Sequence, residues 1–474
     1  MMNARRCQAR TLALALNLAL LLGVALPALA EEHRPHDDLQ FTPVVETSFD
    51  ALPDASATLR WAGVLNGAAY RIEVPAEGWN GQLVMWTHGY VSAAEPKLRA
   101  PNPIMRRTLL AKGFAWAASS YSKNGFDVRG GVEDTNALAL EFPKLAAAHG
   151  KPLPAPKRLF IAGISMGGQI AGAAVERETL ATARHRVRYA GALPMCGVMG
   201  DTELFDYLTA YGQAAGQLAG LPTLLGPAWK DVSETVRGTY WSEFPTKLSA
   251  QGERLRAMVM NLGGGARPFF NEGFADKNMQ NIVWSSFSGD GKLDGVLNAA
   301  VTDTRQIQYR STDTATPPSP FDVQFNTSIR RIAPTPDANR PRQDGLRWIP
   351  LLKAQFEVPV LTLHTLGDLY VPFSMEQIYR RRAIAAGSDG RLVQRAIRDV
   401  GHCAFTAAEA GEAFEDLLAW VDSGSKPAGD DVLDAAKLAD PAYGCRFTRN
   451  QPSAQDYTRP NVRAAHQANY PACP

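Results

Sequence analysis

A serine, an aspartate and a histidine in this chain carry the side chains that acyl transfer requires, and the serine lies in the most distinctive motif. The apolar run 159–162 leads into Gly-Ile-Ser-Met-Gly at 163–167, and a helix-compatible run of small residues follows at 168–174. Gly-x-Ser-x-Gly between a strand and a helix is typical of a nucleophile elbow, a sharp turn that projects the serine hydroxyl from the edge of a sheet. Ser165 is therefore the candidate nucleophile. An ordinary glycine-serine turn is the alternative interpretation.

The candidate acid and base follow two later strands. Asp368 comes after the apolar run 358–364, and His402 comes after the run 391–397. An imidazole at a sheet edge can take the proton of a serine hydroxyl, and a carboxylate behind the imidazole can orient it. The chain order serine, aspartate, histidine is the order found with this kind of elbow. We therefore expect Ser165, Asp368 and His402 to form a catalytic triad.

Two other residues compete for these roles. Asp201 lies beyond the predicted strand 189–195 and is the alternative acid. His364 ends the strand that precedes Asp368, but it is so close to Asp368 in the chain that we interpret it as structural.

A second motif predicts an oxyanion hole. The apolar strand 82–87 ends in His-Gly-Tyr at 88–90. Acyl transfer needs N–H donors aimed at the developing oxyanion. We expect the backbone N–H groups of Tyr90 and Met166 to be these donors.

Two side chains near this loop are candidates to line the substrate pocket. Tyr121 ends the predicted strand 113–121, and His88 begins the loop. The alternative is that residues 119–121 are only the polar end of a strand. For His88 we prefer the interpretation that the ring is structural and braces the loop.

Strand and helix patterns alternate along two parts of the chain. The predicted strands are 58–64, 69–75, 82–87, 113–121, 159–164, 189–195, 358–364 and 391–397, and the predicted helices are 103–112, 133–148, 169–182, 373–385 and one that begins after a capping box of Thr406 and Glu409. The turn Asn66-Gly67 joins the first two strands into a hairpin. This alternation predicts an α/β fold with a mostly parallel sheet that is flanked by helices.

The middle of the chain breaks this alternation. Residues 198–357 are rich in aromatic side chains and show no repeat of strand and helix. A loop of this length is implausible unless it folds by itself, so we predict a large, mainly helical lid inserted before the strand that carries Asp368. A few of its aromatic side chains are expected to wall an apolar substrate pocket. The run 289–294 is interpreted as a turn and not as a calcium loop.

The bounds of the predicted lid also set the bounds of the two parts of the core. The predicted domains are a signal peptide at 1–30, a core in two parts at 31–197 and 358–425, the lid at 198–357, and a C-terminal tail at 426–474.

The N-terminus carries the pattern of an export signal. Three arginines lie within the first ten residues, an apolar run covers 12–26, and Ala-Leu-Ala follows at 28–30. We expect cleavage after Ala30 and a secreted or periplasmic protein, with an uncleaved membrane anchor as the alternative. The net charge of +2 includes the three arginines, so the mature chain carries 2 − 3 = −1. This balance gives no electrostatic basis for binding nucleic acid or an anionic membrane.

These motifs together resemble the α/β-hydrolase superfamily. The elbow, the His-Gly-Tyr loop and the strand-ending Asp368 and His402 all lie where that superfamily has its catalytic residues. The combination of Trp-Asn-Gly at 79–81 with this loop and Gly-His-Cys at 401–403 also resembles a branch of exported bacterial serine hydrolases. The resemblance implies hydrolysis of a carboxylic ester without a metal or an organic cofactor.

Four of the five cysteines remain after the predicted cleavage, and an even count in an exported chain favours two disulfides. Cys196 and Cys403 follow strands that are expected to end near the candidate site. We predict that they pair and fix the His402 loop to the sheet. The tail is expected to be closed by a disulfide between Cys445 and Cys473. The alternative is that Cys403 pairs with a cysteine of the tail.

The sequence supports three functions to different degrees. The leading hypothesis is a secreted serine hydrolase that cleaves a small-molecule or polymeric carboxylic ester through an acyl-enzyme. The alternative is a serine peptidase of the prolyl-oligopeptidase or aminopeptidase kind, which needs acidic groups for the peptide amine; Glu133, Asp134 and Asp201 are the candidates. A non-catalytic binding protein on the same scaffold is the third hypothesis, and the complete triad argues against it.

Overall fold

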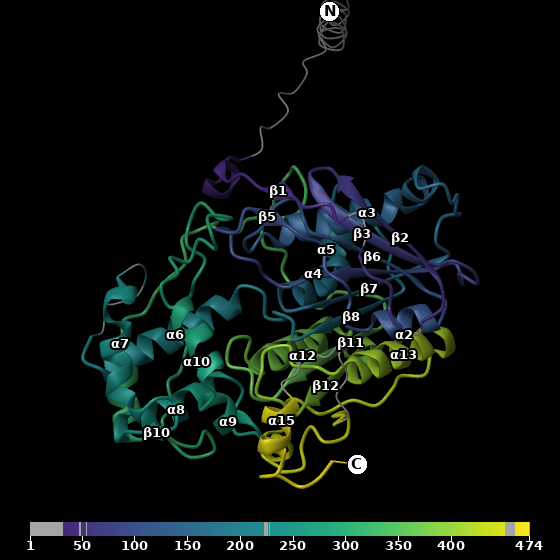
Figure 1. The fold of residues 1–474 in the computed structure, drawn as a ribbon. Coiled ribbons are helices and arrows are strands. Elements are labelled where there is room, and N and C mark those ends of the chain that lie inside the picture. The colour runs from purple at the N-terminus through teal and green to yellow at the C-terminus, as the bar shows by residue number, and fades with distance from the viewer. Residues whose placement is uncertain are drawn as a thin grey trace, which may run out of the picture. The chain divides into compact units, whose positions relative to one another are not determined.

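A central sheet of eight strands organises the described part of the chain, which Figure 1 shows as a ribbon. The computed structural model describes residues 32–46, 49–53, 55–221, 226, 228–450 and 460–473; the signal peptide predicted for 1–30 lies outside these ranges. The strands, in their order across the sheet, are β12 (Leu392–Ile397), β11 (Val360–Thr365), β8 (Gly191–Met195), β7 (Arg158–Ile164), β4 (Gln82–Thr87), β6 (Ala115–Ser119), β3 (Ala68–Pro75) and β2 (Thr58–Leu65). Neighbours from β12 to β6 are parallel, whereas β3 is antiparallel to both β6 and β2. The predicted mostly parallel sheet is confirmed.

The antiparallel edge of the sheet is the predicted hairpin. Asn66 and Gly67 have φ values of 50° and 85°. Positive φ at both central residues is what a type I′ turn requires, and Asn-Gly is its preferred sequence. The register of β2 and β3 runs without interruption from the pair Thr58 and Pro75 to the pair next to the turn.

Helices cover both faces of the sheet. They are α2 (Arg106–Ala111), α3 (Val128–Ala148), α4 (Met166–Ala174), α5 (Arg177–Thr182), α12 (Ser374–Ala386) and α13 (Ala407–Ser423). Along β4, Leu83 and Met85 share one hydrophobic core with α3, α4 and α12, whereas Val84 and Trp86 share a second core with α2 and α13. Successive side chains of a strand point to opposite faces, so both faces are buried, as the continuously apolar strands indicated.

The helix predicted for 169–182 is divided into α4 and α5. Glu176, between the two helices, has an extended backbone with φ −67° and ψ 145°. Its carboxylate accepts hydrogen bonds from the backbone N–H groups of Ala354 and Gln355 at 2.7 and 2.8 Å. Ala354 and Gln355 are far from Glu176 in the sequence. The local helical pattern could therefore not predict the break in this helix.

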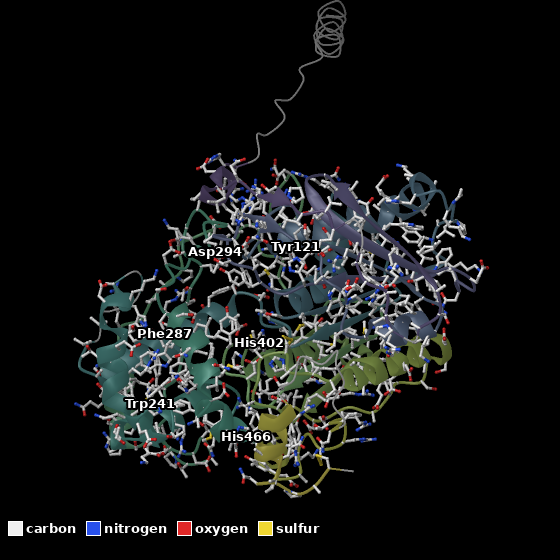
Figure 2. The ribbon with its side chains drawn as sticks, viewed as in Figure 1. Tyr121, Trp241, Phe287, Asp294, His402 and His466 are labelled. Carbon is white, nitrogen blue, oxygen red and sulfur yellow. A yellow bond between two sulfur atoms is a disulfide. The ribbon has the colours of Figure 1, made fainter. Side chains whose placement is uncertain are left out.

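The segment between β8 and β11 forms an insertion with its own aromatic core. Its helices are α6 (Glu203–Leu218), α7 (Trp229–Tyr240), α8 (Ala250–Leu262), α9 (Phe270–Phe274), α10 (Lys277–Ser286) and α11 (Pro320–Ser328), and β9 (Trp241–Glu243) pairs with β10 (Lys247–Leu248). The Trp229 ring lies 5.4 Å from that of Trp284 and 5.3 Å from that of Phe287 between centroids. Phe287 and Trp241 are labelled within this cluster in Figure 2. Most aromatic side chains of the predicted lid thus pack against one another.

The helical part of the insertion ends before its last residues. Residues 339–357 have no regular secondary structure and pack on the first part of the core. The guanidinium of Arg347 pairs with the carboxylate of Glu178 on α5 at 2.5 Å. The Trp348 ring lies within 3.6 to 4.3 Å of three guanidinium groups, those of Arg34, Arg129 and Arg342. The mainly helical lid predicted for 198–357 is therefore helical only up to Ser328 in the described residues.

The C-terminal tail packs against the end of β12. It contains α14 (Ala435–Leu438) and α15 (Pro460–Gln467). Cys445 and Cys473 form a disulfide, as the sequence analysis expected. The buried guanidinium of Arg398, just after β12, donates to the carbonyl oxygens of Tyr443 and Pro471 at 2.9 and 2.8 Å. These bonds make the tail part of the folded core.

Short elements complete the described structure: η1 (Pro35–Asp38), β1 (Thr42–Pro43), which pairs with β5 (Lys97–Leu98), and η2 (Asp389–Arg391). Within the described ranges, none of the helices has both the length and the apolar composition that crossing a bilayer demands.

The turn from β7 into α4 packs tightly against β4. A Cβ atom added to Gly163 would lie 1.9 Å from Oγ1 of Thr87 and 2.5 Å from the carbonyl oxygen of Gly167. A Cβ atom added to Gly167 would lie 2.2 Å from the carbonyl oxygen of Thr87. The Thr87 hydroxyl donates to the carbonyl oxygens of Ala162 and Gly167 at 3.1 and 2.7 Å. Both glycines are therefore required by the close approach of backbones.

We expect Gly163→Ala to lower the free energy of unfolding by about 3 kcal/mol or more, because the added methyl group overlaps backbone atoms of the elbow. Gly238→Ala is the matched control, since nothing lies within 4 Å of a Cβ atom added there in α7. That variant should be as stable as the wild type or more stable by about 0.5–1 kcal/mol. Urea unfolding followed by circular dichroism measures both, and equal stability of the two variants would contradict the tight packing.

Candidate active site

Ser165 lies at the sharp turn between β7 and α4. Its backbone has φ 58° and ψ −126°, a strained conformation for a residue with a side chain. Its N–H donates to the carbonyl oxygen of Met195 at 3.0 Å. Tyr121, Cys196 and Cys403, which follow other strands of the sheet, also have positive φ values. Backbone strain therefore gathers at the carboxyl edge of the sheet, and Ser165 has the elbow geometry that its motif indicated.

His402 joins this serine to a buried carboxylate. Nε2 of His402 lies 2.8 Å from Oγ of Ser165, and Nδ1 lies 2.6 Å from Oδ2 of Asp368. Asp368 is fully buried, and its Oδ1 accepts hydrogen bonds from the N–H groups of Tyr370 and Val371 at 2.9 and 3.0 Å. Figure 2 shows His402 between the sheet and the helices of the insertion. The structure thus brings together the three residues that the sequence analysis grouped as a triad.

This chain of hydrogen bonds fixes the proton positions that general-base chemistry needs. A carboxylate that faces Nδ1 holds the proton of the neutral imidazole on that nitrogen. Nε2 of His402 is then free to accept the proton of the Ser165 hydroxyl. The same carboxylate of Asp368 would stabilise the imidazolium after the transfer.

The predicted oxyanion loop lies directly beside the nucleophile. A Cβ atom added to Gly89 would lie 3.1 Å from Cβ and 3.6 Å from Oγ of Ser165. Met166 is the first residue of α4, so its N–H has no acceptor within the helix. The hydroxyl of Tyr90 forms a hydrogen bond with the carboxylate of Asp294 from the insertion. The backbone N–H groups of Tyr90 and Met166 thus remain the candidate oxyanion donors.

The side chains of His88 and Tyr121 support the loop 88–90 through contacts with its backbone. Their rings stack with centroids 4.0 Å apart, and the Tyr121 hydroxyl donates to the carbonyl oxygen of His88 at 3.0 Å. The two ring nitrogens of His88 face the carbonyl oxygens of Gly89 and Ser120 at 2.7 and 3.1 Å. Burial lowers the pKa of His88, while the hydrogen bonds to Gly89 and Ser120 oppose this shift. This bracing role fits the preferred interpretation of His88, and both side chains are buried. A pocket-lining role for the two side chains stays a prediction.

Asp201, the alternative acid, is engaged elsewhere. Its Oδ2 accepts hydrogen bonds from the guanidinium of Arg382 at 2.7 Å and from the N–H of Leu352 at 2.9 Å. Asp201 therefore ties α12 to the irregular segment 339–357, whereas Asp368 faces the imidazole.

His364 is fully buried in the core and does not contact the serine. Its Nε2 lies 2.8 Å from the carbonyl oxygen of Val371, and its Nδ1 lies 3.4 Å from a carboxylate oxygen of Glu376. Burial lowers the pKa of His364, but the carboxylates of Glu376 and Asp368 outweigh it and raise the pKa overall. The structural interpretation of His364 fits this environment.

A disulfide connects the surroundings of the nucleophile and the base. Cys196, after β8, is bonded to Cys403, with Cα atoms 5.2 Å apart. Sγ of Cys196 lies 3.2 Å from the backbone nitrogen of Ser165, and Sγ of Cys403 lies 3.4 Å from Nε2 of His402. The two sulfurs and this imidazole are close enough to suggest a metal site, but both sulfurs are committed to the disulfide.

Two residues at the site were not singled out by the sequence analysis. The Tyr370 ring meets the His402 ring edge to face, with centroids 5.4 Å apart. Burial, with the nearby carboxylate of Asp294, raises the pKa of Tyr370, so its phenol remains protonated. The position of Tyr370 next to Asp368 is a signal that could have found it. Asp294 carries no such signal, because it lies in the turn 289–294, which the insertion brings next to Tyr90.

The strand order and the site together decide the fold. The nucleophile follows β7, the acid follows β11 and the base follows β12, on a mostly parallel sheet with one antiparallel edge. A nucleophile elbow with partners in this chain order is the mark of one architecture. The chain has the α/β-hydrolase fold. Its segment between β8 and β11 is an insertion into this α/β-hydrolase core.

Known proteins show limited similarity to this chain. No protein-family model matches it. It is 34% identical over 93 residues, 19% of its length, to an o-phthalyl amidase from Xanthobacter agilis, of which the match spans 20%.

The chain is also similar to solved structures of hydrolases. With feruloyl esterase B from Aspergillus oryzae the TM-score is 0.44 at 16% identity, over 80% of this chain and 83% of that one. With another esterase from Aspergillus oryzae it is 0.42 at 13% identity, over 81% and 86%. With an acylaminoacyl peptidase from Pyrococcus horikoshii it is 0.36 at 10% identity, over 81% and 44%.

We expect Gly89→Ala to lower kcat at least about tenfold, because the added methyl group pushes the oxyanion loop away from Ser165 while removing no side-chain chemistry. The thermal unfolding midpoint should fall by only a few degrees, since Gly89 lies in a loop. Steady-state kinetics and calorimetry measure the two effects. A fully active Gly89→Ala variant would contradict the placement of this loop at the reacting carbonyl.

We expect the paired substitution of Cys196 and Cys403 by serine to lower kcat more than the same substitution of Cys445 and Cys473. The first disulfide touches both Ser165 and His402, whereas the second closes the tail. Kinetics on folded protein at 15 °C, with circular dichroism as the test of folding, measures the difference. Equal kcat values for both double variants would contradict a positioning role for the first disulfide.

Proposed function

We propose that this protein is an exported serine hydrolase that cleaves a carboxylic ester. The observation that carries the proposal is the continuous hydrogen-bond chain from the hydroxyl of Ser165 through His402 to the buried carboxylate of Asp368. A strained serine, a general base and an acid in this geometry are the parts of an activated nucleophile.

The proposed reaction proceeds through an acyl-enzyme. Oγ of Ser165 attacks the ester carbonyl carbon while Nε2 of His402 accepts the hydroxyl proton. The carbonyl oxygen becomes an oxyanion that the N–H groups of Tyr90 and Met166 stabilise. Collapse of this intermediate breaks the bond to the alkoxy group, which leaves as the alcohol with the proton from the imidazolium. Water then attacks the acyl-enzyme with the same base and releases the acid.

Amide hydrolysis is the second candidate activity. It is favoured by the similarity to an o-phthalyl amidase, whose name indicates an aromatic acyl group on an amide. The triad serves both reactions, because the imidazolium of His402 can protonate an amine as well as an alcohol when it leaves. The aromatic ring of Tyr370 beside His402 is compatible with an aromatic acyl group in either case.

A peptidase that grips a peptide amine is less well supported. The carboxylate of Glu133 accepts hydrogen bonds from the N–H groups of Arg184 and His185, both at 2.9 Å. That of Asp134 accepts one from the N–H of Ser122 at 2.6 Å. The acidic groups that the sequence analysis offered for the amine are therefore bound to the protein's own backbone.

Export is part of the same proposal. The two disulfides are typical of proteins that fold in an oxidising compartment. With the signal pattern at 1–30, they support a secreted or periplasmic enzyme whose partner is a small-molecule or polymeric ester. Neither nucleic acid nor a membrane is part of the proposal.

We expect wild-type protein to hydrolyse p-nitrophenyl esters of aromatic acids, and Ser165→Ala to lower kcat at least about a thousandfold, because no other hydroxyl can replace the nucleophile. The matched panel consists of the p-nitroanilides of the same acids and of aminoacyl p-nitroanilides. Turnover of esters alone supports the esterase. If aromatic anilides are hydrolysed faster than the esters, the protein is an amidase instead of an esterase. Activity that survives Ser165→Ala would contradict the proposed function.

A further inference from the structure

Side chains of the insertion bind both ends of the loop that carries Asp368. We call residues 366–369 the acid loop. Nε of Arg267 donates to the carbonyl oxygen of Leu366 at 2.7 Å, and the hydroxyl of Tyr207 donates to the carbonyl oxygen of Leu369 at 3.0 Å. Both donors belong to the insertion, Tyr207 on α6 and Arg267 between α8 and α9. Insertion side chains thus bind the first and the last residue of the acid loop, on either side of Asp368 in the chain.

Backbone atoms of the insertion also press on the acid loop. A Cβ atom added to Gly273 of α9 would lie 2.0 Å from the carbonyl oxygen of Gly367, and one added to Gly367 would lie 2.8 Å from the carbonyl oxygen of Phe269. On its other side, the N–H of Gly367 donates to the carbonyl oxygen of Asp399 at 2.9 Å. The acid loop is therefore packed between α9 and the loop that leads to His402.

The tail supports α9 from outside. The hydroxyl of Tyr470 accepts a hydrogen bond from the N–H of Phe269 at 3.0 Å and donates to the carboxylate of Glu272 at 2.8 Å. The rings of Tyr470 and Phe269 stack with centroids 5.0 Å apart. Because the tail is itself bonded to Arg398 after β12, α9 is connected to the sheet independently of the acid loop.

Arg267 adds a charge to this arrangement. Its guanidinium is buried, and its Nη2 has no hydrogen-bond partner among the described residues. Burial lowers the pKa of Arg267 to about 10, against the opposing effect of Tyr207 and Asp368, so the group stays cationic at neutral pH.

We propose that Tyr207 and Arg267 are positioning residues for Asp368, and that the insertion is a fixed part of the catalytic framework here instead of a lid that swings away. The inference rests on the proposed function. Asp368 acts through His402, and an error of about 1 Å in the position of a catalytic group can cost roughly a hundredfold in rate. An insertion that moved away from the sheet would release both bonds to the acid loop.

Tyr207→Phe and Tyr240→Phe form a matched test. Each removes one hydroxyl of a buried insertion tyrosine that donates to a backbone carbonyl oxygen, but the acceptor of Tyr240 is Ala215, within the insertion. We expect Tyr207→Phe to lower kcat for the p-nitrophenyl ester about tenfold to a hundredfold with KM changed less than about twofold. Tyr240→Phe should keep the wild-type kcat. Arg267→Lys, which keeps the charge and loses the bond geometry, should act like Tyr207→Phe.

Proton NMR reads the same effect without a substrate. The proton shared by Nδ1 of His402 and Asp368 gives a low-field resonance, which should shift or broaden in Tyr207→Phe and stay unchanged in Tyr240→Phe. An unchanged kcat and resonance in both Tyr207→Phe and Arg267→Lys would overturn the inference, as would an equal loss of kcat in Tyr240→Phe.

The two proposals can fail separately. If the wild type cleaves neither esters nor amides, the proposed function is wrong, yet the resonance still tests whether the insertion positions Asp368.

Discussion

Two hydrogen bonds to one imidazole unite parts of the chain that are far apart in sequence. His402 lies 237 positions after Ser165 and 34 after Asp368, and a long insertion lies between. β7, β8, β11 and β12 pair in parallel, so their carboxyl ends lie at the same edge of the sheet. Residues that are far apart in the sequence therefore come within hydrogen-bond distance of one another. The Cys196–Cys403 disulfide joins the same two parts covalently. The rest of the site is built around these contacts of His402 with Ser165 and Asp368.

Close packing holds the strained backbone of Ser165 in place at this edge of the sheet. Ser165 has a strained backbone, and such conformations persist only where the surroundings determine them. The elbow glycines pack on β4, the stacked rings of His88 and Tyr121 support the oxyanion loop, and insertion side chains hold the acid loop. The insertion therefore contacts the acid loop through Tyr207 and Arg267, and it contacts Tyr90 through Asp294.

Local sequence patterns were sufficient for the elements of the core and for the candidate triad. Apolar runs predicted the strands, Asn66-Gly67 predicted the hairpin, and Ser165, Asp368 and His402 stood at strand ends in a characteristic order. Those signals are local, because burial on both faces and turn chemistry act over a few residues.

Contacts between distant segments could not be predicted in this way. The break between α4 and α5 depends on Glu176 binding a remote backbone, and the packing of 339–357 on the core depends on pairs such as Arg347 and Glu178. The proposed roles of Tyr207 and Arg267 could not be predicted for the same reason. They depend on hydrogen bonds to carbonyl oxygens of the distant acid loop and not on neighbouring residues in the sequence.

The central claim is that Ser165 is a nucleophile activated by His402, and covalent labelling tests it most directly. A fluorophosphonate that reacts with activated serine hydroxyls should give one adduct per molecule, and peptide mass spectrometry should place it on the peptide that contains Ser165. The adduct should disappear in His402→Ala, which leaves the serine in place but removes its base. Labelling of another residue, or undiminished labelling of Ser165 in His402→Ala, would contradict the account.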